Sequence, residues 1–321
     1  MPTPSPSLAS PASGRRAPGP EAGLSPEAEA RERTRGVLFM LASALGFSVM
    51  SLLVKVASAD FPSMQLVFAR SVFMAVVTYA TMRAAGTAVW GYDRPTLLAR
   101  AVVGATALSL LYVGISRLPL GDAVTIHYTA PVWTSITAAV LLGERLRPRV
   151  LGGVALCLGG VVLVAQPVFL FGEAPDPLDG LGVLAVACGA VLSGTAYTFV
   201  RKLRATDAPM TIIFYLSWVG GLGALPFALS GRWTWPSPVG WALLLGIGLA
   251  THAGQVCLTH GMRRLEAGTA AAVGYVQVVL AFVWGVLFLG DGLDALSLAG
   301  AGLIVASVVL IARRPRRVGA A

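Results

Sequence analysis

Charged residues are scarce in this chain of 321 residues. Asp, Glu, Lys and Arg together make up 12% of it, whereas hydrophobic residues make up 56%, and the mean hydropathy is +0.75. A soluble protein carries roughly 25% charged residues, because they cover its water-facing surface. The composition therefore excludes an ordinary soluble globular protein and predicts that lipid surrounds most of the chain.

Cysteine and histidine occur three times each, and acidic residues are missing from the centre of every apolar run. No Cys-x-x-Cys pair and no Cys/His metal spacing is present, so the sequence indicates neither a disulfide framework nor a zinc site. A membrane enzyme would need a nucleophile–base set, a metal cluster or paired carboxylates. We therefore expect a protein that is not an enzyme and that uses no cofactor and no metal.

Ten apolar runs are long enough to cross a bilayer, which takes roughly 20 residues per helix. A break at Leu118-Pro119-Leu120-Gly121 separates the third run from the fourth. The sequence thus predicts an all-α polytopic membrane protein with ten transmembrane helices. The runs cover 36–56, 64–82, 97–117, 121–142, 149–166, 180–200, 209–230, 238–262, 266–289 and 294–312.

Positive charges gather in alternate connections between these runs. The net charge of +9 is spread over short breaks rather than clustered on one polar face, so nucleic acid is not an expected partner. By the positive-inside rule both termini are cytoplasmic, in a multi-pass protein of the bacterial inner membrane. The cytoplasmic connections contain Arg83, Arg94, Arg100, Arg145, Arg147, Arg149, Arg201, Lys202, Arg204, Arg263 and Arg264.

The two ends of the chain differ in composition from the ten runs. Residues 1–34 contain seven of the 20 prolines, and such a segment buries too little apolar surface to fold. We expect 1–34 to be a disordered cytoplasmic tail and 314–321 to be a basic cytoplasmic tail. Residues 35–166 and 180–313 then form two five-helix units, joined by an external linker at 167–179.

The two units match each other without a gap when the chain is shifted by 147 residues. Because five spans is an odd number, the second unit enters the membrane upside down. Inverted repeats of this kind allow alternating access to a site near the midplane. The matched pairs include Lys55 with Lys202, Gly114 with Gly261, Arg117 with Arg264, Tyr128 with Tyr275, Gly143 with Gly290, Glu144 with Asp291, and Gly153 with Gly300.

Part of the first unit resembles the signature of EamA-type members of the drug/metabolite transporter superfamily. The resemblance rests on Tyr128-Thr129-Ala130-Pro131, on Leu142-Gly143-Glu144-Arg145-Leu146, and on the Gly-rich fifth span. An echo, with Leu289-Gly290-Asp291, covers 275–310. The resemblance implies a ten-helix carrier of small metabolites whose central cavity is formed mainly by spans 1, 3, 4, 6, 8 and 9. The second unit departs from the pattern at Val278, which stands in the place of Pro131.

Arg70 lies well inside the second span, where a charge requires a partner or a wet cavity. It is either a cavity cation that attracts a substrate carboxylate, or a side chain that snorkels to the interface or donates to backbone carbonyls of a neighbouring helix. Tyr112 and Tyr275 lie inside spans and are candidates for stacking on a substrate, with packing against lipid as the alternative. The lack of midspan acids favours a neutral, zwitterionic or anionic substrate.

The middle of the fourth span provides the remaining cavity candidates. Pro131 removes a backbone hydrogen bond and predicts a kink beside His127 and Tyr128. Kinked helices often border transport sites, so these three residues are candidates, with His252 and Gln255 facing them from span eight. For the histidines, the alternative is burial as neutral side chains satisfied by a neighbouring hydroxyl.

Glu144 and Asp291 follow spans four and nine, on opposite sides of the membrane. They are predicted to hold tight turns between helices, with a gating salt bridge as the alternative. The sequence therefore predicts efflux of a small metabolite by alternating access, with an integral-membrane enzyme or a non-transporting receptor or scaffold as the competing classes. The expected partners are the small-molecule substrate and the lipid bilayer, and homodimer formation is left open.

Overall fold

The computed structural model describes residues 26–143, 148–166, 178–203, 205–230, 233–265, 270, 273–292 and 294–312. Within these ranges the chain forms helices joined by short turns, and no strand occurs. This confirms the all-α fold class. Large apolar side chains on the helices face outward: Leu184, Leu222 and Leu249 are 59%, 50% and 60% exposed. A surface of this kind suits lipid rather than water.

The first half of the chain forms six helices, α1 to α6. Asp93 caps α3 by accepting the Thr96 amide N–H at 3.2 Å, the interaction that stabilises an exposed helix start. The hydrogen bonds from Thr96 lower the pKa of the Asp93 carboxyl. The helices are α1 Pro26–Ala57, α2 Ser63–Ala84, α3 Arg94–Arg117, α4 Leu120–His127, α5 Ala130–Leu142 and α6 Pro148–Ala165.

The second half repeats this order. Gly143 and Gly290, which are counterparts in the repeat, follow the last residue of α5 and of the π-helix η1 with φ of +68° and +70°. Glycine adopts this left-handed conformation without steric cost, which explains its place in both turns. The helices are α8 Gly180–Leu203, α9 Pro209–Ala228, α10 Pro238–Arg264, α12 Val276–Trp284, η1 Gly285–Leu289 and α13 Ala295–Ala312.

Among the described residues, six helices are long and apolar enough to cross a membrane by themselves: α1, α2, α3, α8, α9 and α10. The other four predicted spans correspond to the pair α4–α5, to α6, to α12 with η1, and to α13. One expectation about the tail is corrected, because α1 begins at Pro26 and residues 26–34 are therefore helical. Glu27 and Glu29 in its first turn favour this earlier start, since acidic side chains stabilise helix N-termini.

The fourth and ninth predicted spans are both interrupted near their middle. α4 ends at His127 and α5 begins at Ala130, which agrees with the kink expected from Pro131. In the second half Tyr275 separates helical residues 273–274 from α12, although Val278 occupies the position of the proline. The asymmetry that a single proline predicts therefore does not extend to the interruption itself.

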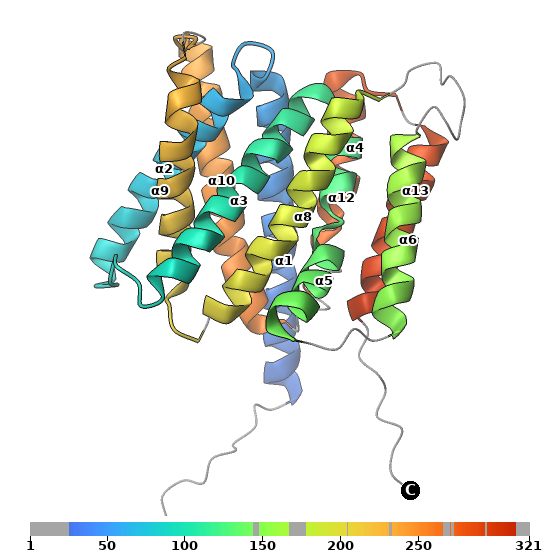
Figure 1. The fold of residues 1–321 in the computed structure, drawn as a ribbon, viewed down its shortest axis with the longest axis horizontal. Coiled ribbons are helices and arrows are strands. Elements are labelled where there is room, and N and C mark those ends of the chain that lie inside the picture. The colour runs from blue at the N-terminus through green and yellow to red at the C-terminus, as the bar shows by residue number, and fades with distance from the viewer. Residues whose placement is uncertain are drawn as a thin grey trace, which may run out of the picture.

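The helices pack in a pattern that is unchanged when the two halves are exchanged. α1 packs against α10 and α3 against α8, two contacts that the repeat interchanges. α2 packs against α9 and α6 against α13, so each of these pairs joins a helix to its own counterpart. In Figure 1 these two pairs form opposite edges of the bundle, and α1 begins on the same side on which α13 ends.

One packing contact of the first helix in each half departs by one residue from the spacing of 147 residues. Gly36 on α1 packs against Leu265, and Gly182 on α8 packs against Leu118. Leu118 and Leu265 are 147 residues apart, whereas the two glycines are 146 apart. The ion-paired acids Glu32 and Asp179 keep the spacing of 147 residues, so the match of Lys55 with Lys202 stays a prediction.

Candidate functional site

Two tyrosines at the interrupted spans lie against each other. The rings of Tyr128 and Tyr275 meet edge to face with their centroids 5.1 Å apart, and the Tyr275 hydroxyl donates to the Tyr128 carbonyl at 3.0 Å. The Tyr128 hydroxyl donates to Gln277 Oε1 at 2.7 Å. Because the tyrosines are counterparts in the repeat, their contact lies on the pseudo-two-fold axis that relates the halves.

Pro131 makes this pair asymmetric. In the second half the Tyr275 carbonyl accepts the amide N–H of Val278 at 2.9 Å. Pro131 is the counterpart of Val278 and has no N–H to donate to the Tyr128 carbonyl. The Tyr275 hydroxyl takes the place of the missing donor. The proline therefore determines which tyrosine hydroxyl bonds to backbone and which bonds to Gln277.

Arg70 lies inside the bundle close to a second arginine, Arg100. Arg70 Nε donates to the Thr251 hydroxyl on α10 at 3.3 Å. Arg100 has its Nε and one terminal nitrogen buried without a hydrogen-bond partner. The two guanidinium groups are close enough for their charges to repel. Across the described ranges, no carboxylate forms an ion pair with either arginine.

Arg100 is a candidate site residue that the sequence pattern did not reveal. It follows Arg94 at the edge of an apolar run, and it therefore counts as one of the cytoplasmic loop charges. The structure begins α3 at Arg94, so Arg100 lies almost two turns inside the helix. The signal that could have found it is its distance from Asp93 and Pro95, which mark the true start of the helix.

Tyr197 on α8 connects the arginines to the tyrosine pair. It lies within electrostatic range of both Arg100 and Tyr128. Tyr197 is nevertheless 49% exposed. A side chain that is deep in the bundle and still accessible requires open space beside it. Tyr197 therefore borders the region between the arginines and the axis.

The other predicted cavity residues have different surroundings. Tyr112 is fully buried, and its hydroxyl lies 3.2 Å from the sulfur of Met50. His127 ends α4 and has a buried Nδ1 without a hydrogen-bond partner. His252 and Gln255 are half-buried on α10, and no described hydrogen bond joins their side chains to the tyrosine pair. Gln277, which the sequence pattern did not single out, bonds to Tyr128 instead.

Asp291 connects the two halves at one end of the bundle. Its Oδ2 accepts the amide N–H of Leu120, the first residue of α4, at 3.0 Å. A carboxylate at this position satisfies a free N–H and is favoured by the helix dipole. Through this bond Asp291 stabilises the start of α4 in the first half, rather than the turn in the second half to which Asp291 itself belongs. Glu144, the counterpart of Asp291, lies outside the described residues.

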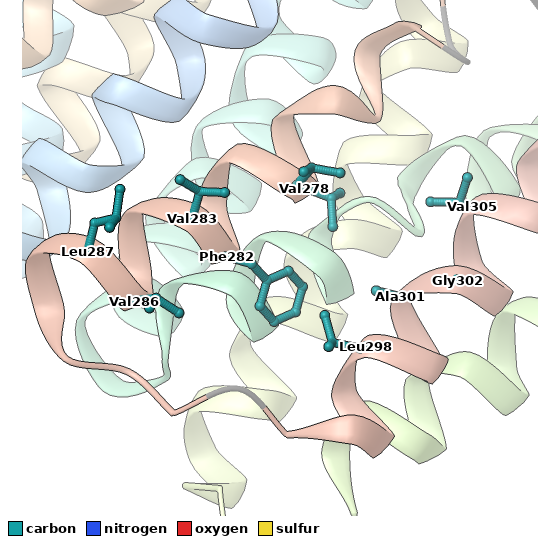
Figure 2. A pocket seen from close by; sticks show the side chains of 10 residues that line it. Val278, Phe282, Val283, Val286, Leu287, Leu298, Ala301, Gly302 and Val305 are labelled. Carbon is teal, nitrogen blue, oxygen red and sulfur yellow. The ribbon is translucent and has the colours of Figure 1, made fainter.

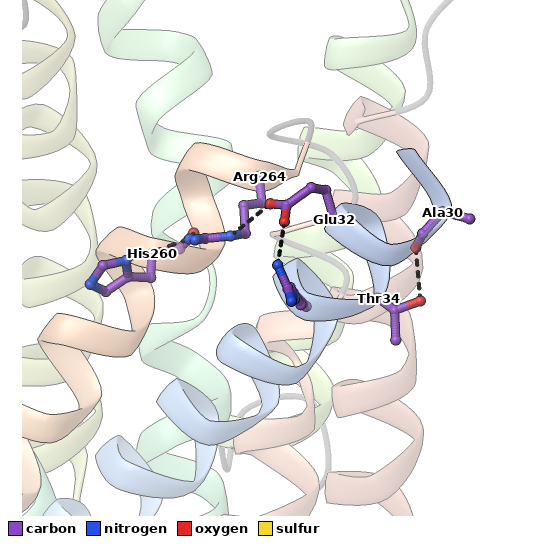
Figure 3. A network of polar contacts seen from close by, with 6 residues as sticks. Ala30, Glu32, Thr34, His260 and Arg264 are labelled. Atoms are coloured by element: carbon purple, nitrogen blue, oxygen red, sulfur yellow. Dashed lines mark hydrogen bonds and ion pairs between the residues drawn. The ribbon is translucent and has the colours of Figure 1, made fainter. Parts of the chain in front are cut away.

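Two ion pairs occupy related positions at the ends of the bundle. Arg264 Nε lies 3.1 Å from Glu32, as Figure 3 shows, and Arg117 lies 2.8 Å from Asp179. The arginines are counterparts in the repeat, and each pairs with an acid of the other half. The hydrogen bond from Arg117 lowers the pKa of the Asp179 carboxyl. Both pairs are partly exposed, so they contribute little to stability.

An apolar groove of about 590 Å³ lies between α12–η1 and α13. Figure 2 shows its lining, which includes Val278, Phe282, Val286, Leu298 and Val305. All of its lining side chains are apolar or glycine, so the groove has no side-chain hydrogen-bond donor or acceptor. It suits a hydrocarbon chain of the lipid and does not suit a polar metabolite.

These features define a polytopic helical membrane protein built from two repeats. The chain belongs to the EamA-like transporter family, whose sequence profile matches residues 34–166 and 180–313. This confirms the family that the residues around Tyr128 and Gly143 predict. The match to both halves also confirms that they are two copies of one unit.

Similar proteins are transporters by name. The pseudopaline exporter CntI of Pseudomonas aeruginosa is 32% identical over 87% of this chain and 96% of its own length. Human solute carrier family 35 member G1 is 30% identical over 85% of this chain and 78% of its own length. A probable terminal-alkyne amino-acid exporter of Streptantibioticus cattleyicolor is 31% identical over 67% of this chain and 72% of its own length. A crystal structure with 21% identity superimposes over 87% of this chain and 96% of its own with a TM-score of 0.60, which supports the fold.

Proposed function

We propose that this protein exports a small neutral, zwitterionic or anionic metabolite by alternating access. In this proposal it spans the bacterial inner membrane ten times, with both termini in the cytoplasm. The broken pair α4–α5, α6, α12 with η1, and α13 supply the four spans beyond the six long helices. The distribution of Lys and Arg supports the orientation.

The observation that carries the proposal is the contact between Tyr128 and Tyr275 on the pseudo-two-fold axis. In inverted-repeat transporters the substrate site lies near the midplane, at the interface of the repeats, beside interrupted helices. Here both interrupted spans meet at this contact. Arg70, Arg100 and Tyr197 lie on the neighbouring helices α2, α3 and α8.

Alternation also needs contacts that can exchange between the two sides of the membrane. The ion pairs Arg264–Glu32 and Arg117–Asp179 connect the halves at related positions at opposite ends. A carrier that opens on one side would break one pair and keep the other. Weak, partly exposed pairs suit this role because a gate must open at small cost.

The direction of transport is inferred from the relatives, two of which are named exporters. The class of substrate is inferred from charge. Midspan arginines without described carboxylate partners attract anions and repel cations. A zwitterion with an accessible carboxylate fits the same site.

The test compares metabolites released by cells that overproduce the protein, by cells that lack it, and by cells that produce Tyr275→Phe. We expect one or more small acids or zwitterions to accumulate outside the overproducing cells, with reduced export by the variant. Tyr79→Phe is the matched control, because Tyr79 is 45% exposed on α2 and no described hydrogen bond involves its hydroxyl.

Flux into proteoliposomes of purified protein then separates transport from the competing classes. An enzyme would convert a metabolite without moving it, and a receptor would bind it without flux. Absence of flux for every metabolite released in cells would contradict the proposal.

A further inference from the structure

We propose that Arg70 and Arg100 form one binding site for two acidic groups of a single small metabolite. The substrate class is then a dicarboxylate, or a zwitterion with more acidic than basic groups. This inference rests on the proposed function and narrows the class of substrate to metabolites that carry two acidic groups. It adds Arg100, whose unpartnered nitrogens provide the evidence for the second subsite.

Two neighbouring cations inside a membrane protein are costly when nothing neutralises them. A single Arg at the centre of a membrane helix is costly on insertion scales, and repulsion between Arg70 and Arg100 adds to this cost. Structural arginines in membranes normally pair with an acid or with backbone carbonyls. Among the residues that the structure describes, the side chain of Arg70 has a threonine hydroxyl, and Arg100 Nε has no partner. A bound dianion would supply the missing charge.

The two arginines approach the site from opposite membrane faces. Arg70 lies seven residues after the start of α2, and Arg100 lies six residues after the start of α3. At 1.5 Å per residue, each Cα is about 10 Å from a helix end, and these ends lie on opposite sides of the membrane. Arg70 Nε contacts Thr251 midway along α10, and a terminal nitrogen of Arg100 lies beside Gly104, one turn further into α3, so both side chains extend toward the middle level of the bundle. One ligand of a few carbon atoms can therefore reach both.

The surrounding residues position the cations rather than neutralise them. The Thr251 hydroxyl accepts from Arg70 Nε at 3.3 Å, which leaves the terminal nitrogens of that fork for a ligand. The same hydroxyl donates to the Ile247 carbonyl at 2.7 Å, so its orientation is fixed. Guanidinium groups bind carboxylates through two parallel hydrogen bonds, and two such forks select a ligand with two carboxylates.

The test measures the affinity of purified protein in lipid nanodiscs for defined probes, from the rise in unfolding temperature at constant ionic strength. The probes are glutarate as a dianion with two carboxylates, iminodiacetate as a zwitterion with two carboxylates and one ammonium group, glycine as a zwitterion with one carboxylate, and putrescine as a cation. We expect both dicarboxylates to stabilise the wild type at lower concentration than glycine does, and putrescine to have no effect.

The variants Arg70→Gln and Arg100→Gln should each bind iminodiacetate about 10- to 100-fold more weakly, since each loses one charge-assisted contact. Arg100→Lys should bind with intermediate affinity, because it keeps the charge and loses the fork. Arg83→Gln and Arg94→Gln are matched controls on the same helices, since both arginines are exposed, and they should bind like the wild type.

A readout without ligand distinguishes this site from a structural role. Arg100→Gln removes charge repulsion, so the unliganded variant should unfold at the same or a higher temperature than the wild type. A lower unfolding temperature of Arg100→Gln, unchanged iminodiacetate affinity in Arg100→Gln, or equal affinity for glycine and the two dicarboxylates would each overturn the inference. The metabolite release of the wild type reports separately on transport, so failure of the two-arginine site leaves the proposed function testable by itself.

Discussion

Removing the Tyr275 hydroxyl should destabilise the protein through a carbonyl that has no alternative donor. In Tyr275→Phe the Tyr128 carbonyl loses its bond at 3.0 Å, and Pro131 cannot replace it. A buried unsatisfied group costs about 1–3 kcal/mol, and measured side-chain hydrogen bonds in membranes average about 0.6 kcal/mol. We therefore expect a loss of about 1–2 kcal/mol, measured by SDS titration of purified protein.

Pro131→Val provides the decisive comparison, because it gives the first half the residue found in the second. The new amide N–H can bond to the Tyr128 carbonyl, as Val278 does to the Tyr275 carbonyl at 2.9 Å. Adding Tyr275→Phe to Pro131→Val should therefore cost about half as much stability as adding Tyr275→Phe to the wild type. The smaller loss is expected because the buried Tyr128 carbonyl is again bonded. Additive losses, or no loss in Tyr275→Phe, would refute the reasoning about the proline.

Three further outcomes follow from single contacts. Gly160→Ala should lower stability by about 1–3 kcal/mol through overpacking, because its Cβ would lie 2.7 Å from the Gly300 carbonyl oxygen. Gly159→Ala is the control: its Cβ meets open space, so it should be neutral or slightly stabilising in the same SDS titration. Asp291→Ala should lower stability by about 1 kcal/mol through loss of the bond to the α4 N-terminus, and Asp291→Asn should lose less. The pKa of Asp179 is lowered, so its stabilising effect is present above the unfolded value of 3.8 and lost as the pH falls through the folded value. The difference in unfolding temperature between wild type and Asp179→Asn should therefore be constant from about pH 5 to 8 and shrink below about pH 4.

Most helix positions follow from hydropathy, because a membrane span must be apolar over nearly its whole length. The predicted run 238–262 and the observed α10 Pro238–Arg264 begin at the same proline. Hydropathy does not reveal the interruption at Tyr275, because Val276 and its neighbours are apolar and no proline marks the break. It also gave no sign that residues 26–34 continue α1, since composition alone does not show that a polar helix extends out of the membrane.

The candidate site was harder to predict, because whether a residue belongs to it depends on the depth of that residue in the membrane and on the side of the helix it occupies. Arg70 is visible in the sequence as a charge surrounded by apolar residues. Arg100 carries the same charge but lies near a run boundary, and boundaries are uncertain by more than one helical turn. Gln277 is a single amide in an apolar run, and only the contact with Tyr128 shows its role. Pairings across halves require the packing of the helices, which a one-dimensional pattern does not contain.

In the proposed mechanism, the elements that exchange conformation occur in both halves, whereas the residues that bind the substrate occur in one. Helix contacts, the arginines of the two ion pairs and the paired tyrosines occur in both halves, as a mechanism that exchanges two conformations requires. The two arginines of the proposed anion site occur in one half only: the counterpart of Arg70 is Ser217, and that of Arg100 is Ile247. A symmetric site would hold four cations around one small substrate, and their mutual repulsion would exceed what two carboxylates can neutralise. When the two arginines lie in one half only, the helix packing can remain symmetric. The positive charge of the site is then small enough for one metabolite to neutralise it.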